Sequence, residues 1–288
     1  MNAVIFALIT YFGWGIGDVF GIIPARTIGP YRTMIGFIVI TLAVFFPMVF
    51  FHTSELSQFT PTIFVISVTL GGLFILGNIA IGEALRRTYA SLALTIFSSY
   101  SALIVLLSVI FYREPLTVWQ IISIAVIFVG VFFCTYVPGG NSNLTASHKI
   151  GIVWALVGMI SIGIFFTAIK PVVAIVGWFW PIYLTSLWLP VVVWIVWKKN
   201  ELNLPKNWKS AMFPLVACTV LLRGGDFFFN AAIDKGLIAV VAPIAGAYPT
   251  LSVILAYFVF REVPTRRQIT GIVLALTGIV ALAWVSSV

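Results

Sequence analysis

The sequence predicts an all-α membrane protein with ten transmembrane helices in two tandem halves of five helices each. Three observations predict this fold class: an apolar composition, apolar segments long enough to cross a bilayer, and an internal repeat. Hydrophobic residues make up 61% of the 288 positions and charged residues only 8%, whereas soluble domains carry roughly 25% charged residues. So few charges cannot supply the polar surface of a soluble fold of this length.

Ten apolar segments follow one another along the chain, and they approach the roughly 20 residues that a membrane-spanning helix needs. Turn-forming residues separate them, such as Ile28-Gly29-Pro30 and the Pro-Gly-Gly-Asn stretch at 138–141. Polar and apolar residues do not alternate with a period of two, which excludes membrane strands. The predicted helices are Ala3–Ile22, Tyr31–Phe51, Ile63–Ala84, Ala90–Phe111, Val118–Val137, Ile150–Ala168, Phe179–Trp197, Ala211–Ile233, Ala239–Phe260 and Gln268–Val285.

An internal repeat relates the two halves at a constant offset of 148 residues. The sequence Tyr-Arg-Glu-Pro-Leu-Thr at 112–117 matches Phe-Arg-Glu-Val-Pro-Thr at 260–265, and the same offset pairs Tyr100 with Tyr248 and Asn78 with Asp226. The predicted units are a first repeat over 1–137, a linker over 138–149 and a second repeat over 150–288. Five helices is an odd number, so the halves enter the bilayer in opposite orientations. Many secondary transporters use such inverted-topology repeats to build a midplane site that opens to each side in turn.

The chain resembles the drug/metabolite transporter superfamily, and within it the EamA-type transporters. The resemblance rests on the two five-helix repeats, on Trp14-Gly15 in the first helix, and on the Arg-Glu-Pro-Leu-Thr turn before the fifth. It implies a central cavity lined by helices one to four and six to nine, with helices five and ten bracing the periphery. It does not specify a substrate, because the family moves amino acids, sugars, nucleotides and other metabolites.

The distribution of Lys and Arg predicts the orientation of the chain. Alternate loops carry twelve cations in one set and three in the other, and cytoplasmic loops are the ones enriched in Lys and Arg. The sequence therefore predicts cytoplasmic odd-numbered loops and both termini outside, whereas better-known members of the resembled family keep both termini inside. The larger set contains Arg26, Arg32, Arg86, Arg87, Lys149, Lys198, Lys199, Lys206, Lys209, Arg261, Arg266 and Arg267; the smaller contains Arg113, Lys170 and Lys235.

Ionisable residues within the predicted membrane helices are the candidates for function, because each costs about 2.5–3.5 kcal/mol to insert and usually faces a cavity or a partner. Arg223, Asp226 and Asn230 recur at i, i+3 and i+7 and form one polar stripe on the eighth helix. Two interpretations stay open: a substrate-binding stripe, or an Arg223–Asp226 pair that serves only insertion and packing. Asp18, late in the first helix, faces cavity or interface.

Further candidates are aromatic or lie near helix ends. Tyr100 and Tyr248 occupy equivalent positions in two predicted cavity helices, and Tyr11 and Trp14 share one face of the first helix. With Asn78, these side chains complete the predicted substrate-binding set, although aromatic residues in membrane helices more often serve packing. Two other groups receive structural interpretations: Glu83 pairs with Arg86 and Arg87 at the interface, and Lys170 snorkels at a helix end.

Several classes of function find no support in the residues. The sequence has no Walker-type phosphate loop, and its two histidines, His52 and His148, lie apart from any carboxylate or cysteine cluster. Cys134 and Cys218 lie inside apolar segments and form no metal or redox pattern, so no metal or cofactor is expected. The basic residues do not form a nucleic-acid-binding patch. The expected partners are a small-molecule substrate and membrane lipids, and a homodimer stays open.

These patterns predict a secondary transporter, facilitated or proton-coupled, that moves a small polar metabolite resembling an amino acid across the cytoplasmic membrane. The alternatives are a flippase for lipid-linked head groups and, less favoured, a membrane-embedded enzyme. A carboxylate in a low-dielectric cavity can bind and release a proton as the cavity alternates between the two sides. Asp226 is the favoured proton carrier and Asp18 the second candidate.

Overall fold

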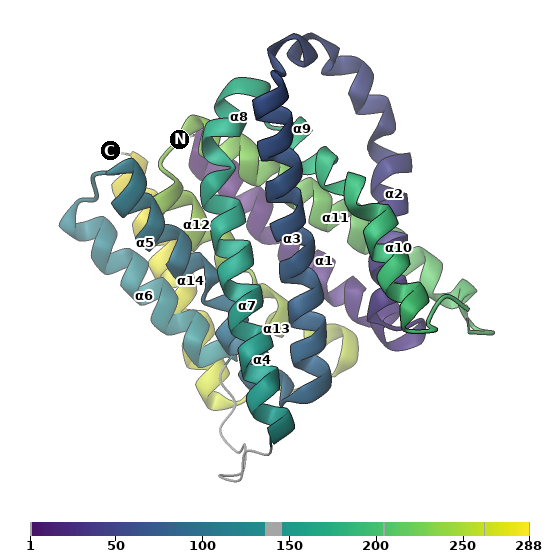
Figure 1. Cartoon of the computed structure of the whole chain (residues 1–288). Helices are drawn as coiled ribbons and strands as arrows, with labels where there is room; N and C mark the ends of the chain where they lie inside the picture. Colours follow the sequence, from purple (N-terminus) through teal and green to yellow (C-terminus); the bar gives the residue numbers. More distant parts are fainter. Residues whose placement is uncertain (1, 136–145, 204, 262, 288) are drawn as a thin grey trace.

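The computed structural model describes residues 2–135, 146–203, 205–261 and 263–287, and this part of the chain is helical throughout, without strands (Figure 1). Its elements are α1 (Asn2–Thr27), α2 (Pro30–Phe51), η1 (Thr53–Gln58), α3 (Pro61–Arg87), α4 (Ala90–Ser98), α5 (Tyr100–Tyr112), α6 (Val118–Thr135), α7 (Ala146–Ala168), α8 (Lys170–Val176), α9 (Trp180–Tyr183), η2 (Leu184–Trp188), α10 (Leu189–Lys198), α11 (Lys209–Lys235), α12 (Ile238–Gly246), α13 (Pro249–Phe260) and α14 (Arg266–Ser287).

Within the described residues these elements form ten segments that are long and apolar enough to cross a membrane, which confirms the predicted number. The fourth and ninth spans are each interrupted, the fourth between α4 and α5 at Ser99 and the ninth between α12 and α13 at Ala247. These two positions are 148 residues apart. Local chemistry explains both interruptions: the Ser99 hydroxyl donates to the Thr95 carbonyl (3.1 Å), and Pro249, which lacks an N–H, begins α13.

The repeat is visible in the backbone conformation of its turns. Gly29 and Gly177, 148 residues apart, both have positive φ angles of 88° and 73°, a conformation that glycine adopts without steric cost. Arg113 and Arg261, at the same offset, are both left-handed with φ of 52° and 59°. Glu262, the counterpart of Glu114, lies outside the described residues, as do residues 138–145 of the predicted linker.

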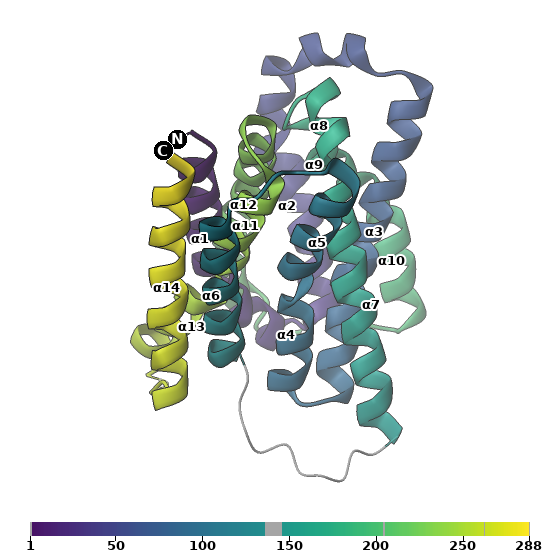
Figure 2. The same cartoon turned by 90° about the vertical axis from the view of Figure 1, so that its left-hand side faces the viewer.

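Helix pairing gives the molecule an approximate two-fold arrangement. α1 packs along α11 and α3 packs along α7, and the repeat exchanges one pair for the other. α6 and α14, the last spans of the two halves, pack on each other at one edge of the molecule (Figure 2). Small residues allow this approach, because a Cβ atom on Gly130 would lie 2.4 Å from the Ala275 nitrogen and one on Gly271 would lie 2.6 Å from the Gly130 carbonyl oxygen.

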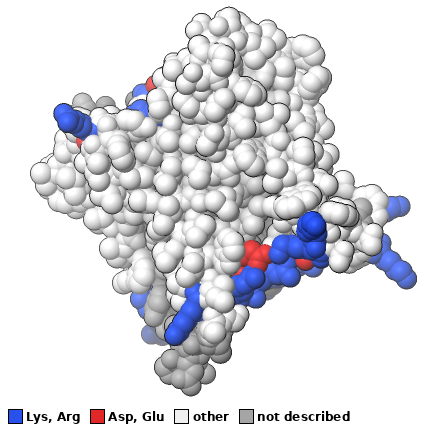
Figure 3. All heavy atoms as spheres, in the orientation of Figure 1, with Lys and Arg blue, Asp and Glu red and all other residues white. Residues whose placement is uncertain are grey.

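The two ends of the helical bundle differ in charge. The twelve cations of the larger loop set lie at the end that carries residues 28–29, 88–89 and 199–208, which we call the basic side. Both termini lie at the opposite end with residues 52–60, 113–117 and 236–237, which we call the terminal side (Figure 1). In the space-filling view, charged atoms gather along the lower edge, with a small group at the upper left and an uncharged band between (Figure 3). This band matches the part that the bilayer covers.

Candidate substrate cavity

A cavity of about 370 Å³ lies between the two halves. Its lining comes from α1, α2, α3, α4, α7 and α11 together with Tyr100 and Tyr248, and it runs from Trp14 at mid-depth to Ala25 and Leu85 near the basic side. Spans five and ten contribute nothing to the lining, as the family resemblance implied. Span seven also contributes nothing, contrary to that expectation, because η2 packs against α3 and α10 against α2. The Trp188 Nε1 group donates to the Val68 carbonyl there (2.8 Å).

Aromatic rings close the inner end of the cavity toward the terminal side. The Trp14 ring stacks on Phe229 with centroids 5.5 Å apart and lies 5.5 Å from Phe166, and Phe166 lies 4.7 Å from Phe229. Phe229 is buried and lies outside the lining. Because these rings fill the space at the centre of the bundle, the cavity ends at them. The structure therefore shows a state with access from the basic side.

Arg223 is fully buried in the wall of the cavity, and three kinds of contact hold it. Its guanidinium carbon lies 4.7 Å from the ring centroid of Phe37 and 4.9 Å from that of Phe74, so two cation–π contacts hold its plane. Its Nε donates to Thr41 Oγ1 (3.3 Å) and its Nη1 donates to Asp226 Oδ2 (3.2 Å). Its Nη2 is buried without a hydrogen-bond partner among the described residues.

Asp226 uses both carboxylate oxygens for contacts inside the protein. Oδ1 accepts from Trp14 Nε1 (3.0 Å) and Oδ2 accepts from Arg223 Nη1. The glycine next to it makes this possible, because a Cβ on Gly225 would lie 2.6 Å from the Trp14 ring. The predicted pairing of Arg223 with Asp226 is therefore present, and it includes Trp14 of the other half.

Asp18 also lines the cavity, but its contacts differ from those of Asp226. No hydrogen bond or ion pair to its carboxylate is found within the described part of the chain, and its side chain is partly exposed. The groups that interact with it electrostatically include the hydroxyls of Tyr100 and Tyr248. Among the intramembrane carboxylates predicted to function, Asp18 is thus the one without a fixed partner.

The remaining candidates divide into two groups. Asn78, Tyr100 and Tyr248 line the cavity, and Asn78 Nδ2 donates to the Phe74 carbonyl (2.8 Å). Tyr11 and Asn230 lie outside the lining. The Tyr11 hydroxyl is hydrogen-bonded to Thr250 Oγ1 (2.9 Å) and joins α1 to α13.

Asn230 does not continue the stripe into this cavity. Its Nδ2 donates to the Trp178 carbonyl (3.0 Å) near the terminal side, and its Oδ1 is buried without a partner among the described residues. The repeat offset places Asn230 on Gly82, which does line the cavity. The helix periodicity was right about the shared face of α11, but the cavity reaches only the part of that face nearer the basic side.

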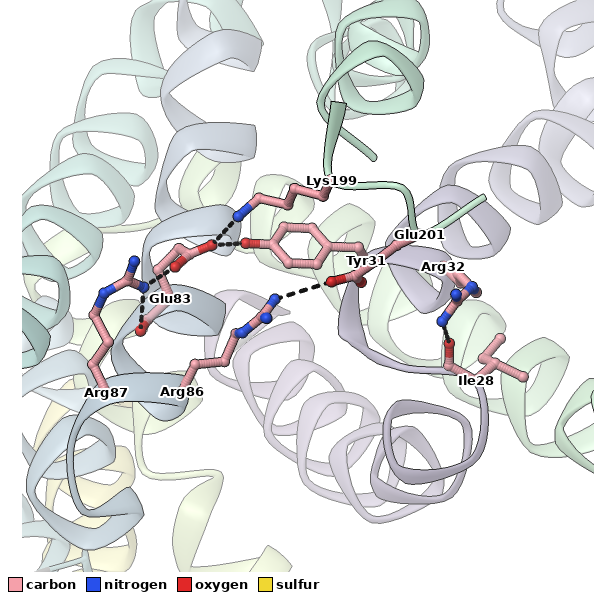
Figure 4. A network of polar contacts seen from close by, with 8 residues as sticks. All are labelled: Ile28, Tyr31, Arg32, Glu83, Arg86, Arg87, Lys199 and Glu201. Atoms are coloured by element: carbon pink, nitrogen blue, oxygen red, sulfur yellow. Dashed lines mark hydrogen bonds and ion pairs between the residues drawn. The ribbon is translucent and has the colours of Figure 1, made fainter. Parts of the chain in front are cut away.

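Charged residues surround the mouth of the cavity at the basic side (Figure 4). The buried Glu83 carboxylate accepts from the Tyr31 hydroxyl, from Arg87 and from Lys199 Nζ (2.7 Å to Lys199). The interfacial pairing predicted for Glu83 is thus present with Arg87. The prediction was wrong for Arg86, which pairs with Glu201 (3.2 Å). These contacts tie α2, α3 and the end of α10 together at the rim.

At the terminal side, Glu114 connects the two halves. Its buried carboxylate accepts from the backbone N–H groups of Ile238 (3.1 Å) and Ala239 (2.8 Å), which begin α12, and it pairs with Lys170 of α8. Lys170 is therefore not the snorkelling side chain that the sequence suggested. The Tyr112 hydroxyl adds a bond to the Thr167 carbonyl (2.8 Å). These contacts form what we call the terminal-side latch.

Residues that sequence reasoning missed are mainly aromatic. Phe37 and Phe74 enclose the Arg223 guanidinium, and Phe166 forms part of the cavity floor. Their sequence positions look like ordinary lipid-facing or packing positions, since the chain has 25 phenylalanines. Thr41 carried no signal either, because its partner lies 182 residues away.

Two inverted five-helix halves around a cavity that carries buried charges define a membrane transporter of the drug/metabolite type. The model of the EamA-like transporter family matches residues 1–136 and 149–284, and the chain belongs to this family. The two matched segments correspond to the two predicted repeats. The family consists of transporters rather than enzymes. The protein is accordingly an integral membrane protein.

Comparison with characterised proteins and solved structures adds fold information only. No curated protein matches the sequence. Among 29 matching chains of solved structures, the crystal structure of one protein aligns with 98% of this chain and with 96% of its own length, with a TM-score of 0.79 and 15% identity. At this identity the likeness establishes the fold and carries no information on the substrate.

Proposed function

We propose that the protein is a secondary transporter for small amphipathic metabolites of the amino-acid type, and that Arg223 anchors the substrate carboxylate. The observation that carries this proposal is the buried Arg223 guanidinium, held by Phe37, Phe74 and Thr41, with its Nη2 unpartnered in the cavity wall. A buried donor without a partner costs about 1–3 kcal/mol, and a carboxylate oxygen would remove that cost. The aromatic walls suit the apolar part of the same molecule.

The size of the cavity agrees with a small substrate. Its volume of about 370 Å³ lies at the lower end of the roughly 300–1,000 Å³ typical of small-molecule sites. A lipid-linked head group with its acyl chains would need a lateral path out of the helical bundle. The proposal therefore favours a soluble metabolite over the flippase alternative, which a transport experiment also tests.

For proton coupling, the geometry favours Asp18 over Asp226, the reverse of the order that the sequence suggested. Asp226 can take up a proton only if its contacts with Arg223 and Trp14 weaken. Asp18 can gain or lose a proton without breaking an ion pair. We therefore propose Asp18 as the proton-binding group if transport is coupled to protons.

The transport experiment uses proteoliposomes preloaded with unlabelled amino acids, and measures counterflow of the same radiolabelled mixture. Gly82 lines the cavity and Gly224 does not, and a Cβ atom on either glycine would meet nothing within 4 Å. Gly82→Phe is therefore expected to plug the cavity and abolish counterflow, whereas Gly224→Phe is expected to retain it. Equal flux through both variants would contradict transport through this cavity. Movement of labelled lipid alone would favour the flippase.

A second arm of the same experiment imposes a pH gradient on the vesicles. Proton coupling predicts that the gradient raises accumulation in the wild type and in Asp226→Asn, if that variant folds, but not in Asp18→Asn. The measured quantity is the ratio of accumulation with and without the gradient, so a reduced absolute flux does not confuse the result. Wild-type accumulation that ignores the gradient would leave facilitated diffusion as the mechanism.

We also propose that the basic side faces the cytoplasm of the plasma membrane and that both termini lie outside, because positive loops remain on the cytoplasmic side. In a variant with Cys134 and Cys218 replaced, a cysteine at Ser54 is expected to react with an impermeant maleimide in intact cells. A cysteine at Lys206 is expected to react only after permeabilisation. The opposite pattern would reverse the orientation and make the cavity face outward.

A further inference from the structure

Asp18 gives the cavity a negative charge that the described residues do not neutralise. The cation in the cavity wall, Arg223, is already paired with Asp226 (3.2 Å). Asp18 lines the same cavity without an ion pair or hydrogen bond in the described part of the chain. An intramembrane carboxylate is costly and normally faces a partner or a functional site. The missing counter-charge therefore has to come from solvent, a proton or a ligand.

Aromatic groups surround the place where that counter-charge would bind. Trp14 lies one helical turn before Asp18 on α1, and its ring lies 5.7 Å from that of Tyr248 in an edge-to-face arrangement. The Tyr100 ring stacks with Phe166 at 6.2 Å. The hydroxyls of Tyr100 and Tyr248, one from each repeat, interact electrostatically with the Asp18 carboxylate. Faces of Trp and Tyr rings attract cations, most strongly where water is excluded.

This combination favours an organic ammonium over a metal ion. A hard metal ion binds through several oxygen ligands at short range, whereas the groups around Asp18 offer mainly ring faces and two phenol hydroxyls. A primary ammonium donates hydrogen bonds to a carboxylate and to hydroxyl oxygens, and its adjacent carbon atoms pack against rings. These are the groups that line this part of the cavity.

We propose that Asp18, together with Trp14, Tyr100 and Tyr248, forms a binding subsite for the primary ammonium group of the transported molecule. This inference rests on the proposed function, in which Arg223 binds the carboxylate, and it assigns the other end of the substrate. A proton on Asp18 would cancel its charge, so the proton and the ammonium group can occupy this residue only one at a time.

The test is equilibrium binding of three radiolabelled probes to the purified full-length protein in lipid nanodiscs. The probes are L-phenylalanine, 2-phenylethylamine, which lacks the carboxylate, and 3-phenylpropionate, which lacks the ammonium group. A hydrogen bond to a charged group contributes about 1.5–3 kcal/mol. Asp18→Asn is therefore expected to lower the affinity ratio of 2-phenylethylamine to 3-phenylpropionate by about tenfold or more. Glu201→Gln removes a carboxylate outside the cavity and is expected to leave the ratio unchanged.

The outcomes separate this inference from the proposed function. The double variant Arg223→Ala with Asp226→Ala is expected to shift the affinity ratio in the opposite direction, because it removes the carboxylate anchor. If that shift occurs while Asp18→Asn leaves the ratio unchanged, the ammonium subsite is wrong and the Arg223 anchor stands. Absence of 2-phenylethylamine binding to the wild type also overturns the subsite. If none of the three probes binds the wild type, the amino-acid type of substrate is wrong as well.

Discussion

Arg223→Ala is expected to destabilise the folded protein by about 3–5 kcal/mol, the usual cost of removing one partner of a buried ion pair. The substitution leaves the Asp226 carboxylate buried with Trp14 as its remaining partner, and it empties the space between Phe37 and Phe74. The thermal midpoint and the yield of monodisperse protein in detergent measure this effect. Arg86→Ala is the matched control, because Arg86 is half-exposed in its pair with Glu201 and such pairs contribute about 1 kcal/mol or less.

A double replacement separates the structural role of Arg223 from substrate binding. Arg223→Ala combined with Asp226→Ala removes both charges, so most of the lost stability is expected to return. If Arg223 anchors the substrate carboxylate, counterflow of amino acids stays absent in this stable double variant. Full recovery of counterflow together with stability would show that the pair serves only insertion and packing, and the proposed anchor would be wrong.

Glu114→Ala is expected to shift the protein toward a state that is open at the terminal side. The variant loses the two N–H contacts at the start of α12 and the ion pair with Lys170. These contacts join the loop after α5 to the second half, so they must separate if the halves part at that end. Hydrogen bonds to a charged group contribute about 1.5–3 kcal/mol, so the open population is expected to rise about tenfold to a hundredfold.

The repeat indicates where to measure this opening. Leu85 lines the cavity at the basic side, and the offset of 148 residues places it on Ile233, which is buried near the terminal side. With the native cysteines replaced, a cysteine at Ile233 is expected to react faster with a maleimide in the Glu114→Ala background. A cysteine at Leu85 is expected to react no faster. Unchanged reactivity at Ile233 in a folded variant would contradict the role of Glu114 as a latch.

The offset that relates the halves also explains one mismatch between sequence and structure. Asn230 was predicted to bind substrate with Arg223 and Asp226, yet it lies outside the cavity with its Oδ1 unpartnered among the described residues. Its counterpart Gly82 lines the cavity. In an inverted repeat, exchanging the conformations of the two halves would bring Asn230 to the wall of a cavity on the terminal side. Periodicity identifies a face of a helix, whereas the conformational state decides how much of that face is exposed.

Sequence alone determined the number of spans, the repeat and the inverted arrangement of its halves. These follow from length, hydropathy and motif spacing, which act locally or at one constant offset. The positions of the breaks beside Tyr100 and Tyr248 were not predicted, because apolar segments continue through them without a change in hydropathy. Local hydroxyl bonds and Pro249 interrupt the helices there.

The tertiary structure decided which charged groups are already paired. In sequence, Asp226 and Asp18 are both isolated intramembrane carboxylates, and only Arg223, one helical turn from Asp226, suggests a difference between them. Folding brings Trp14 of the other half to Asp226, and it leaves Asp18 facing two tyrosines without a cation among the described residues. These contacts join residues more than 80 positions apart, so no periodicity or spacing within one helix encodes them. They arise only where α1, α5, α11 and α13 meet around one cavity.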